Sequence, residues 1–526
     1  MSYPPIFIIH LEGGSNTSSE KSILKDMEIK RGKGLQEMPK KGFVSLLRVS
    51  IIRLLILLLL LILLSCYGGA GNGGSLMIYD FTVYHDEQNA LRIIAEWKTL
   101  QPADSKIEYR EFMDSGNWMS TPINNLKVTD HKVIIVGLHP ETHYVFRPVS
   151  DNITGDEVTI STKEMPELLP QTQLVVNMSG TSSNDLTIGG FPSPISTIVA
   201  VNGEGRIVWY HEDSNNGDPG DFSVIDEDGR LIYNLFKIIK AVDFMGNEEV
   251  LLNVQSFGEV CHHDFLITPQ GNYMYLSRSM VFVNDREWCV DEIVERDKDG
   301  GEVWRWRSRE HADKLGGFVE GNVWQEEYID GCGYDWTHCN SIDLKKDREG
   351  KQFIILSVRN LNRVIKIDYH SGEIIWQLGD DLDFEFIGSE PEELQWFRCQ
   401  HSASYLPDVS SILLFDNGNE RYEIDTDDFS RAVIYKIDEE NMTAEITWKY
   451  DIQSFAGHAG AVQRLSNGNI LITLPTDRSM MRSAFIEVDE SEERLWQVEF
   501  IYPQALAYNF LLGNMRISSL YDLYKK

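Results

Sequence analysis

The stretch VAVNGEGRIVW, residues 199–209, decides the fold, because variants of it recur along the chain. Each copy has an apolar run, a turn rich in Asp, Asn or Gly, a second apolar run and a closing large residue. The closing positions are Trp209, Leu252, Trp304, Trp376, Trp448 and Trp496. Strand pairs that repeat every 40 to 50 residues or so, with insertions, are typical of propeller blades. Six copies therefore predict an all-β chain with a six-bladed β-propeller over residues 166–526.

A second β-domain is expected in front of the propeller. Residues 76–165 form short alternating runs separated by turn residues, which is the pattern of a β-sandwich. GLHPETHYVF places Tyr144 where a tyrosine corner would lie, and Trp97 lies in another strand-like run. The segment resembles a fibronectin type III or related immunoglobulin-like module. Its role stays open between a spacer or docking module and a structural cap.

The N-terminal residues read as an export leader. Basic residues after Met38 precede an apolar run from Leu54 to Leu64, which is shorter than the roughly 20 residues that span a bilayer. The run ends in Leu-Leu-Ser-Cys66, which resembles a bacterial lipobox with a lipidated cysteine. We therefore expect a leader over 1–65, a glycine-rich tether over 66–75 and a lipoprotein anchored in the bacterial cell envelope, in the periplasm or at the cell surface.

Composition limits the partners. The chain has 526 residues and a formal net charge of −33, which argues against nucleic acid as a partner. An anionic substrate would need a local cluster of positive groups. Six cysteines include Cys66, so an odd number remains after it and at least one thiol is expected outside any disulfide. The pairing among them stays open, as does a homodimer.

Histidines occupy matched positions in three repeats. His263 and His401 each lie six residues before a proline, just before or within a predicted inner strand, and His338 takes a similar place in the repeat between them. A single histidine is more often a packing residue. Because equivalent positions of successive blades are related by rotation about the propeller axis, three matched histidines predict a site at the central channel.

Two more residues complete this candidate site. Asn340 follows His338 by two positions and should point the same way along an extended strand. Arg359 follows the apolar strand FIILSV. We rank the remaining polar residues lower: His262 and His458 as neighbours, Asp416, Asn417 and Gly418 as a turn, Arg431 as an inter-blade ion pair, and Asp264 as a strand start or a histidine partner.

These residue types suit the transfer of a tetrahedral oxyanion. Three histidines could hold a catalytic metal, but an arginine beside a dication would be repelled. The planar donor fork of arginine suits tetrahedral oxyanions. A neutral imidazole is also a nucleophile. The set predicts one histidine that attacks while Arg359, Asn340 and the other histidines hold the charged oxygens.

Several blocks of the repeat region resemble the bacterial arylsulfate sulfotransferase family. They are WTHCNSID, ILSVRNLNRVIKIDYHSGEIIWQLG, QHSASYLPDVSSILLFDNG, SRAVIYKID, LSNGNILI and the closing NMRISSLYDLY. The resemblance implies a six-bladed propeller that moves a sulfuryl group from a phenolic sulfate ester to a phenol, with no cofactor and no nucleotide sulfate donor.

The resemblance also implies residue roles. His401 would be the nucleophile and become transiently sulfated, while Arg359, Asn340 and His338 would stabilise the sulfuryl oxygens. His263 is the simplest proton donor, although the assignment stays open between His263 and His338. Two other functions stay open from the residues alone: a metal- or quinone-dependent propeller oxidoreductase, and a non-catalytic surface adhesin.

Overall fold

The structure is a computed structural model. It describes residues 76–178, 185–192, 196–213, 219–226, 228–318, 328–329, 331–419, 421, 429–477, 482–502, 511–517 and 520. The expected leader, the tether and Cys66 lie outside the described residues. No helix within the described ranges is long and apolar enough to cross a membrane.

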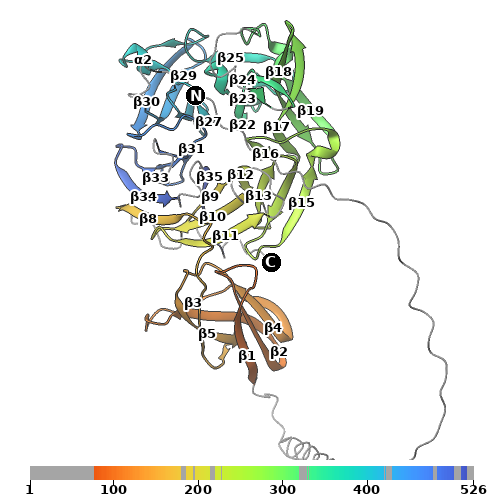
Figure 1. The fold of residues 1–526 in the computed structure, drawn as a ribbon, viewed down its shortest axis with the longest axis vertical. Helices are drawn as coiled ribbons and strands as arrows, with labels where there is room; N and C mark the ends of the chain where they lie inside the picture. The colour runs from red at the N-terminus through yellow and green to blue at the C-terminus, as the bar shows by residue number, and fades with distance from the viewer. Residues whose placement is uncertain are drawn as a thin grey trace, which may run out of the picture. The chain divides into compact units, whose positions relative to one another are not determined.

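Six sheets, antiparallel in their main strands, follow one another around a ring (Figure 1). Blade 1 contains β9 (Leu186–Phe191), β10 (Ser196–Asn202), β11 (Ile207–Asp213) and β35 (Leu512–Ile517). Blade 2 contains β12 (Pro219–Ile225), β13 (Leu231–Leu235), β14 (Ile238–Val242) and β15 (Glu248–Asn253). Blade 3 contains β16 (Phe265–Ile267), β17 (Tyr273–Val283), β18 (Arg286–Arg296) and β19 (Glu302–Arg307), with β20 (Tyr328–Ile329) and β21 (Gly333–Asp335) added at the side of β18.

The second half of the ring has the same plan. Blade 4 contains β22 (Cys339–Lys346), β23 (Gln352–Val358), β24 (Arg363–Asp368) and β25 (Ile374–Leu378). Blade 5 contains β27 (His401–Tyr405), β28 (Ser411–Asp416), β29 (Arg431–Asp438), β30 (Thr443–Asp451) and the short β26 (Glu385–Phe386). Blade 6 contains β31 (Ala461–Arg464), β32 (Ile470–Leu474), β33 (Arg482–Val488), β34 (Arg494–Ile501) and β8 (Gln171–Asn177). The six-bladed propeller is confirmed.

The repeat used to predict the blades has a common register. Trp209 pairs with Ala200 at a β-bulge, and the closing residue of every other copy pairs at a bulge in the same way. The bulge bends the fourth strand and turns the large side chain toward the neighbouring blade. The Trp209 indole donates to Phe244 O of the next blade at 2.9 Å, and Trp496 donates to Gly203 O at 3.0 Å. These two indoles therefore join adjacent blades.

Strands from both ends of the repeat region close the ring. β35 pairs with β9 and completes blade 1, and it also contacts β12 and β31 of the neighbouring blades. β8 pairs with β34 on the other side of the closure. Blade 1 and blade 6 therefore each combine strands that are far apart in sequence.

The N-terminal region is also built from strands. They are β1 (Ile78–His85), β2 (Ile93–Glu111), β3 (Met119–Ser120), β4 (Asn124–Ile135), β5 (His143–Ser150), β6 (Ile153–Thr154) and β7 (Val158–Ser161). The Tyr144 hydroxyl accepts a hydrogen bond from His139 N at 3.0 Å, as a tyrosine corner does, and Trp97 is buried. Its kinship to fibronectin modules stays a prediction.

Helical structure is sparse in the described part of the chain. The short helices are η1 (Val254–Phe257), η2 (Ser308–His311), η4 (Arg359–Leu361) and α2 (Glu392–Gln395). The first of these precedes the entry to blade 3, and η4 follows β23 directly. The predicted site residues lie next to these segments: His263 follows η1 and precedes β16, and Arg359 is the first residue of η4.

Candidate active site

The three predicted histidines lie at the entries of consecutive inner strands. His263 comes two residues before β16, His338 immediately before β22, and His401 is the first residue of β27. The rings of His263 and His338 have centroids 4.9 Å apart. His401 lies close enough to both for its charge state to affect that of His263 and to be affected by His338. The structure thus brings all three histidines together.

The backbone at these entries is unusual. His263 and His338 have φ values of 53° and 47°, in the left-handed region that non-glycine residues rarely adopt, and Ser402 after His401 has φ 55°. A β-bulge also interrupts β22 after Cys339 and β27 after His401. Bulges near functional sites re-aim side chains, and strained backbone gathers at such sites.

His401 is held by an amide. Its Nδ1 lies 2.7 Å from Asn417 Oδ1 and 3.2 Å from Cys399 O. The Asn417 Nδ2 donates to Ala456 O at 2.7 Å and to Ala459 O at 2.9 Å, which fixes the amide with its oxygen toward the histidine. Because both groups that face Nδ1 are acceptors, Nδ1 carries the proton and the lone pair of the neutral ring lies on Nε2.

Arg359 supplies the local positive charge. It is buried at the start of η4, where Nη1 donates to Asn360 Oδ1 at 2.8 Å and Nη2 to Gly457 O at 3.2 Å. After burial itself, this guanidinium has the largest influence in lowering the pKa of His401 well below its ordinary value. The imidazole of His401 is therefore neutral at neutral pH, the form that can attack an electrophile.

Asn340 lies beside His401, although not for the reason expected. The left-handed backbone at His338 and the bulge at Asn340 break the simple alternation from which a shared face was inferred. Asn340 instead reaches the neighbouring blade, where its Nδ2 donates to Gln400 O at 2.8 Å. Its buried Oδ1 has no hydrogen-bond partner in the described structure. The amide thus contacts the residue directly before His401.

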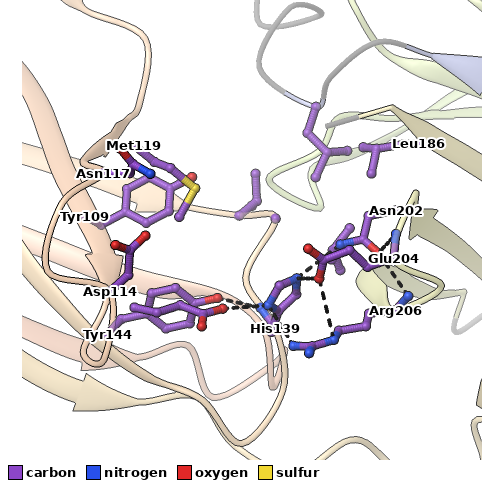
Figure 2. A pocket seen from close by; sticks show the side chains of 15 residues that line it. Tyr109, Asp114, Asn117, Met119, His139, Tyr144, Leu186, Asn202, Glu204 and Arg206 are labelled. Atoms are coloured by element: carbon purple, nitrogen blue, oxygen red, sulfur yellow. Dashed lines mark hydrogen bonds and ion pairs between the residues drawn. The ribbon is translucent and has the colours of Figure 1, made fainter. Parts of the chain in front are cut away.

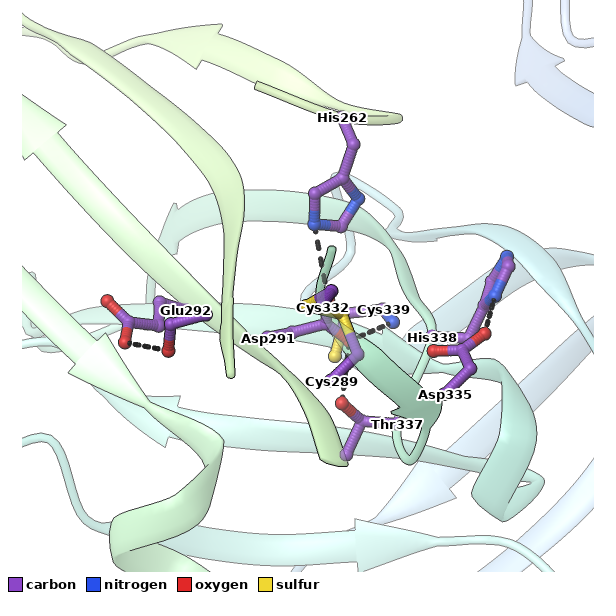
Figure 3. The surroundings of a disulfide bond; sticks show 10 residues. His262, Cys289, Asp291, Glu292, Cys332, Asp335, Thr337, His338 and Cys339 are labelled. Carbon is purple, nitrogen blue, oxygen red and sulfur yellow. Dashed lines mark hydrogen bonds and ion pairs between the residues drawn. A yellow bond between two sulfur atoms is a disulfide. The ribbon is translucent and has the colours of Figure 1, made fainter. Parts of the chain in front are cut away.

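A carboxylate holds His338. Its Nδ1 is hydrogen-bonded to the buried carboxylate of Asp335, the last residue of β21 (Figure 3). β21 pairs with β18, where Asp335 lies opposite Cys289. Cys289 and Cys332 form a disulfide, which ties the segment before β21 to β18. Cys261, Cys339 and Cys399 are buried thiols outside this disulfide, which confirms the expectation that at least one thiol lies outside any disulfide.

His263 contacts another histidine. Its Nδ1 lies 2.8 Å from Nδ1 of His262, and Nε2 of His262 lies 3.2 Å from the buried Asp291 carboxylate. Burial alone would raise the pKa of Asp291, but His262, the Cys339 amide and Thr337 hold it at about 2. The carboxylate is therefore ionised, and it places the proton of His262 on Nε2. His262 Nδ1 then accepts a hydrogen bond from the Nδ1–H of His263.

The lower-ranked residues have different outcomes. His458 lies three residues before β31, so blade 6 also carries a histidine near its inner strand. It was ranked lower because its spacing along the chain is out of phase with that of His263 and His401. Asn417 was expected only in a turn and instead holds His401. Arg431 donates to the buried Asp416 carboxylate at 2.7 Å, while Asp264 accepts from Ile342 N of blade 4 at 2.8 Å.

The lowered pKa of His263 and of His401 predicts that the fold loses stability in acid. Burial first, and then neighbouring positive groups, lower the pKa of His263 and His401 well below 6.5. The unfolded chain therefore binds more protons as the pH falls below about 6.5, so the stabilising contribution of each neutral histidine is present above that pH and is lost below it. We expect the free energy of unfolding to fall by up to about 1.4 kcal/mol per pH unit from each ring.

Chemical denaturation of wild type and His401→Gln at pH 7, 6 and 5 measures this effect. The variant should lose less stability on acidification than the wild type, because one buried neutral ring is gone. Equal pH dependence of the two proteins would contradict the assignment of His401 as a buried neutral histidine.

A polar cluster outside the inner-strand histidines has the residue types of a metal site. In the described residues, His211, Asp213 and Glu248 have ligand atoms close enough together to hold a metal ion. The buried Lys240 ammonium lies 2.7 Å from Asp213 and 2.6 Å from Glu248, so a cation already balances these carboxylates. This geometry favours a structural ion-pair network.

A cavity of about 450 Å³ is lined by residues of the N-terminal strands and of blade 1 (Figure 2). His139 lies at its wall, with Nδ1 2.8 Å from Glu111 and Nε2 3.1 Å from the amide of Asn202. None of the three inner-strand histidines lines this cavity. The candidate active site formed by the three inner-strand histidines is therefore separate from this cavity.

Solved structures give only distant likenesses. A periplasmic gluconolactonase of Pseudomonas aeruginosa, PpgL, is 11% identical, with 79% of this chain and 99% of that chain covered and a TM-score of 0.30. Hydrazine synthase of Kuenenia stuttgartiensis is 12% identical, with 63% and 80% covered and a TM-score of 0.31. We draw no conclusion from these scores.

Comparisons of sequence are more informative. No curated protein matches the chain. A protein-family model does match, and it is that of the arylsulfotransferases (ASST), over residues 193–509. The matched region contains all six fourth strands of the propeller and each of the inner-strand histidines. The chain therefore belongs to the arylsulfotransferase family.

Proposed function

We propose that this protein moves a sulfuryl group from a phenolic sulfate ester to a phenolic acceptor by a ping-pong mechanism with a sulfated His401. Family membership supports an aryl sulfotransferase. The observation that carries the mechanism is the pairing of His401 Nδ1 with the fixed amide of Asn417, since it leaves the Nε2 lone pair for attack.

In the first half-reaction, His401 Nε2 attacks sulfur and the phenolic oxygen leaves. Arg359 and Asn340 stabilise the sulfuryl oxygens, while His263 or His338 supplies a proton to the leaving oxygen. In the second half-reaction, an acceptor phenol loses its proton and attacks the sulfur on His401. The transition state is expected to be loose, so fixed donors contribute more than nucleophile strength.

An exchange assay tests the proposal. Purified protein is mixed with 4-nitrophenyl sulfate and phenol, and the release of 4-nitrophenol and formation of phenyl sulfate are followed at several concentrations of each. Ping-pong transfer predicts parallel lines in double-reciprocal plots and no requirement for a nucleotide sulfate. Intersecting lines would show that both substrates must bind together, which contradicts a covalent intermediate.

The same preparation decides between the other functions raised by the sequence. A metal- or quinone-dependent oxidoreductase would contain a stoichiometric metal or a quinone absorption band. A non-catalytic adhesin would show no sulfuryl transfer. Transfer by protein without metal or chromophore would exclude both.

We also propose that the protein is exported and held in the cell envelope by a lipid on Cys66, a residue outside the described part of the chain. The lipobox-like sequence before it supports this anchor. The full-length protein should partition into detergent when expressed in a bacterium, and Cys66→Ser should move it to the aqueous phase. Equal partition of the two proteins would contradict a lipid anchor.

A further inference from the structure

The Nδ1 atoms of the three inner-strand histidines face three different partners. His401 faces the neutral amide of Asn417, His338 the carboxylate of Asp335, and His263 the imidazole of His262. In each ring the partner engages Nδ1, so Nε2 remains for substrate chemistry. A histidine whose Nδ1 faces a carboxylate is stabilised as the imidazolium, whereas an amide gives no such charge stabilisation.

The amide suits a nucleophile. Asn417 Oδ1 accepts a hydrogen bond but does not take the proton, so Nδ1 of His401 keeps its hydrogen before and after sulfation. The sulfated ring then carries an imidazolium charge, and the neutral imidazole is a good leaving group when the acceptor attacks. The two carbonyls that bind the Asn417 Nδ2 prevent the amide from reversing.

The carboxylate suits a proton carrier. Asp335 is buried, and its backbone oxygen accepts a hydrogen bond from Asn360 Nδ2 at 3.1 Å. Asn360 in turn accepts from Arg359, so one network positions the carboxylate and the guanidinium. The His338 side chain is 23% exposed, whereas His401 is buried, so an incoming phenol has more access to the ring of His338.

His263 is less suited to carry the proton. Its Nδ1 contacts an imidazole, and the ionised Asp291 lies beyond that ring, next to His262 Nε2. Burial and the neighbouring His338 lower the pKa of His263 well below its ordinary value, which disfavours the protonated form. A neutral His263 whose Nδ1 donates to His262 has a lone pair on Nε2, so it has no proton there to give to the leaving oxygen.

We propose, on the basis of the proposed function, that these partners set the roles of the histidines: Asn417 positions His401 as the nucleophile, and Asp335 positions His338 as the residue that donates and recovers the proton. In the first half-reaction, the His401 Nε2 lone pair forms the N–S bond. The electron pair of the S–O bond goes to the phenolic oxygen, which takes the proton from His338 Nε2.

The second half-reaction reverses these transfers. The acceptor hydroxyl gives its proton to His338 Nε2 as its oxygen forms a bond to sulfur. The electron pair of the N–S bond returns to His401 Nε2. Both histidines then have their starting protonation, so no other reactant is needed.

Leaving-group dependence tests this assignment. The donor kcat/KM is measured for 4-nitrophenyl sulfate, whose phenol is acidic, and for phenyl sulfate, whose phenol is weakly acidic and needs a proton to leave. Asp335→Asn should lower the value by at least about 10²-fold for phenyl sulfate and by less than about threefold for 4-nitrophenyl sulfate. Asn417→Ala should lower both values by the same factor, about tenfold or more, because it disorders the nucleophile.

Asp291→Asn is the matched control, because it removes the other buried carboxylate next to a histidine. It should leave the ratio of the two donor values unchanged, whatever it does to the overall rate. Equal loss with both donors in Asp335→Asn, or a changed ratio in Asp291→Asn, would overturn the assignment. Those outcomes leave the sulfotransferase function standing, whereas a wild type that transfers from neither donor would overturn that function as well.

A second variant covers the case in which Asp335→Asn does not fold. His338→Ala removes the ring and leaves the carboxylate in place. Imidazole added to the solution should then raise the rate with phenyl sulfate more than with 4-nitrophenyl sulfate, because only the first needs a proton donor. Equal or absent rescue with the two donors would overturn the role of His338.

Discussion

Replacing His401 by alanine is expected to lower sulfuryl transfer from 4-nitrophenyl sulfate to phenol by at least about 10⁴-fold. The variant lacks the atom that forms the N–S bond, and no other histidine of the cluster has an Nδ1 held by an amide. Arg359 and Asn340 would still bind the sulfuryl oxygens, so the KM for the donor should change far less than kcat. Stopped assays at saturating donor measure both constants.

His311→Ala is a suitable control for this variant. His311 belongs to η2 and stacks on Trp306, with ring centroids 5.0 Å apart, so its loss also removes a packed imidazole. The control should retain transfer within about threefold of the wild type, since surface and peripheral substitutions have small effects. Comparable activity of His401→Ala and wild type would remove the nucleophile assignment.

Replacing Arg359 by lysine is expected to lower kcat/KM by about 10²-fold, and replacing it by alanine by about 10³-fold. Lysine keeps the charge but loses the planar fork whose two terminal nitrogens donate to Asn360 and to Gly457 O. The loss should appear mainly in kcat, because charge on the sulfuryl oxygens is stabilised most strongly in the transition state.

Loss of Arg359 has a second expected consequence. The guanidinium is the main charged group that lowers the pKa of His401, so Arg359→Ala should make that ring easier to protonate. The acid limb of the pH–rate profile should move to higher pH in the variant. Arg482→Lys, on an exposed arginine paired with Glu499, should change neither kcat/KM nor the profile. An unchanged acid limb in Arg359→Ala would contradict the electrostatic coupling.

Much of the fold follows from one repeated register. The closing residue of each copy, from Trp209 in the first to Trp496 in the last, could be recognised in the sequence because it is large. It must be large because it fills the space between two blades at the same bulge. The closure of the ring was not predicted, since the pairing of β35 with β9 and of β8 with β34 joins segments from opposite ends of the repeat. Such long-range pairing has no local sequence signal.

The site was predictable to the extent that blade symmetry determines it. His263, His338 and His401 were found because they share one position in the repeat. Their partners were missed, because Asn417 resembles an ordinary turn residue and Asp335 lies within a long insertion. Within this insertion β21 pairs with β18, and Cys332 forms a disulfide with Cys289 of β18. These two contacts place Asp335 next to His338.

Local geometry differs from the assumption that placed Asn340 beside the histidines. The extended strand assumed between His338 and Asn340 does not exist, since His338 has a positive φ and a bulge follows. A period-of-two argument fails wherever the backbone leaves the extended region. Asn340 lies near His401 because the inner strands of blades 4 and 5 are adjacent.

Intact-mass analysis after incubation with donor alone tests the central claim most directly. If His401 is the nucleophile, wild-type protein treated with 4-nitrophenyl sulfate and no acceptor should gain about 80 Da, the mass of one SO₃ group. Fragmentation should place the adduct on His401, and added phenol should remove it. An adduct on another residue, or continued transfer to phenol by a protein that never gains this mass, would contradict the account.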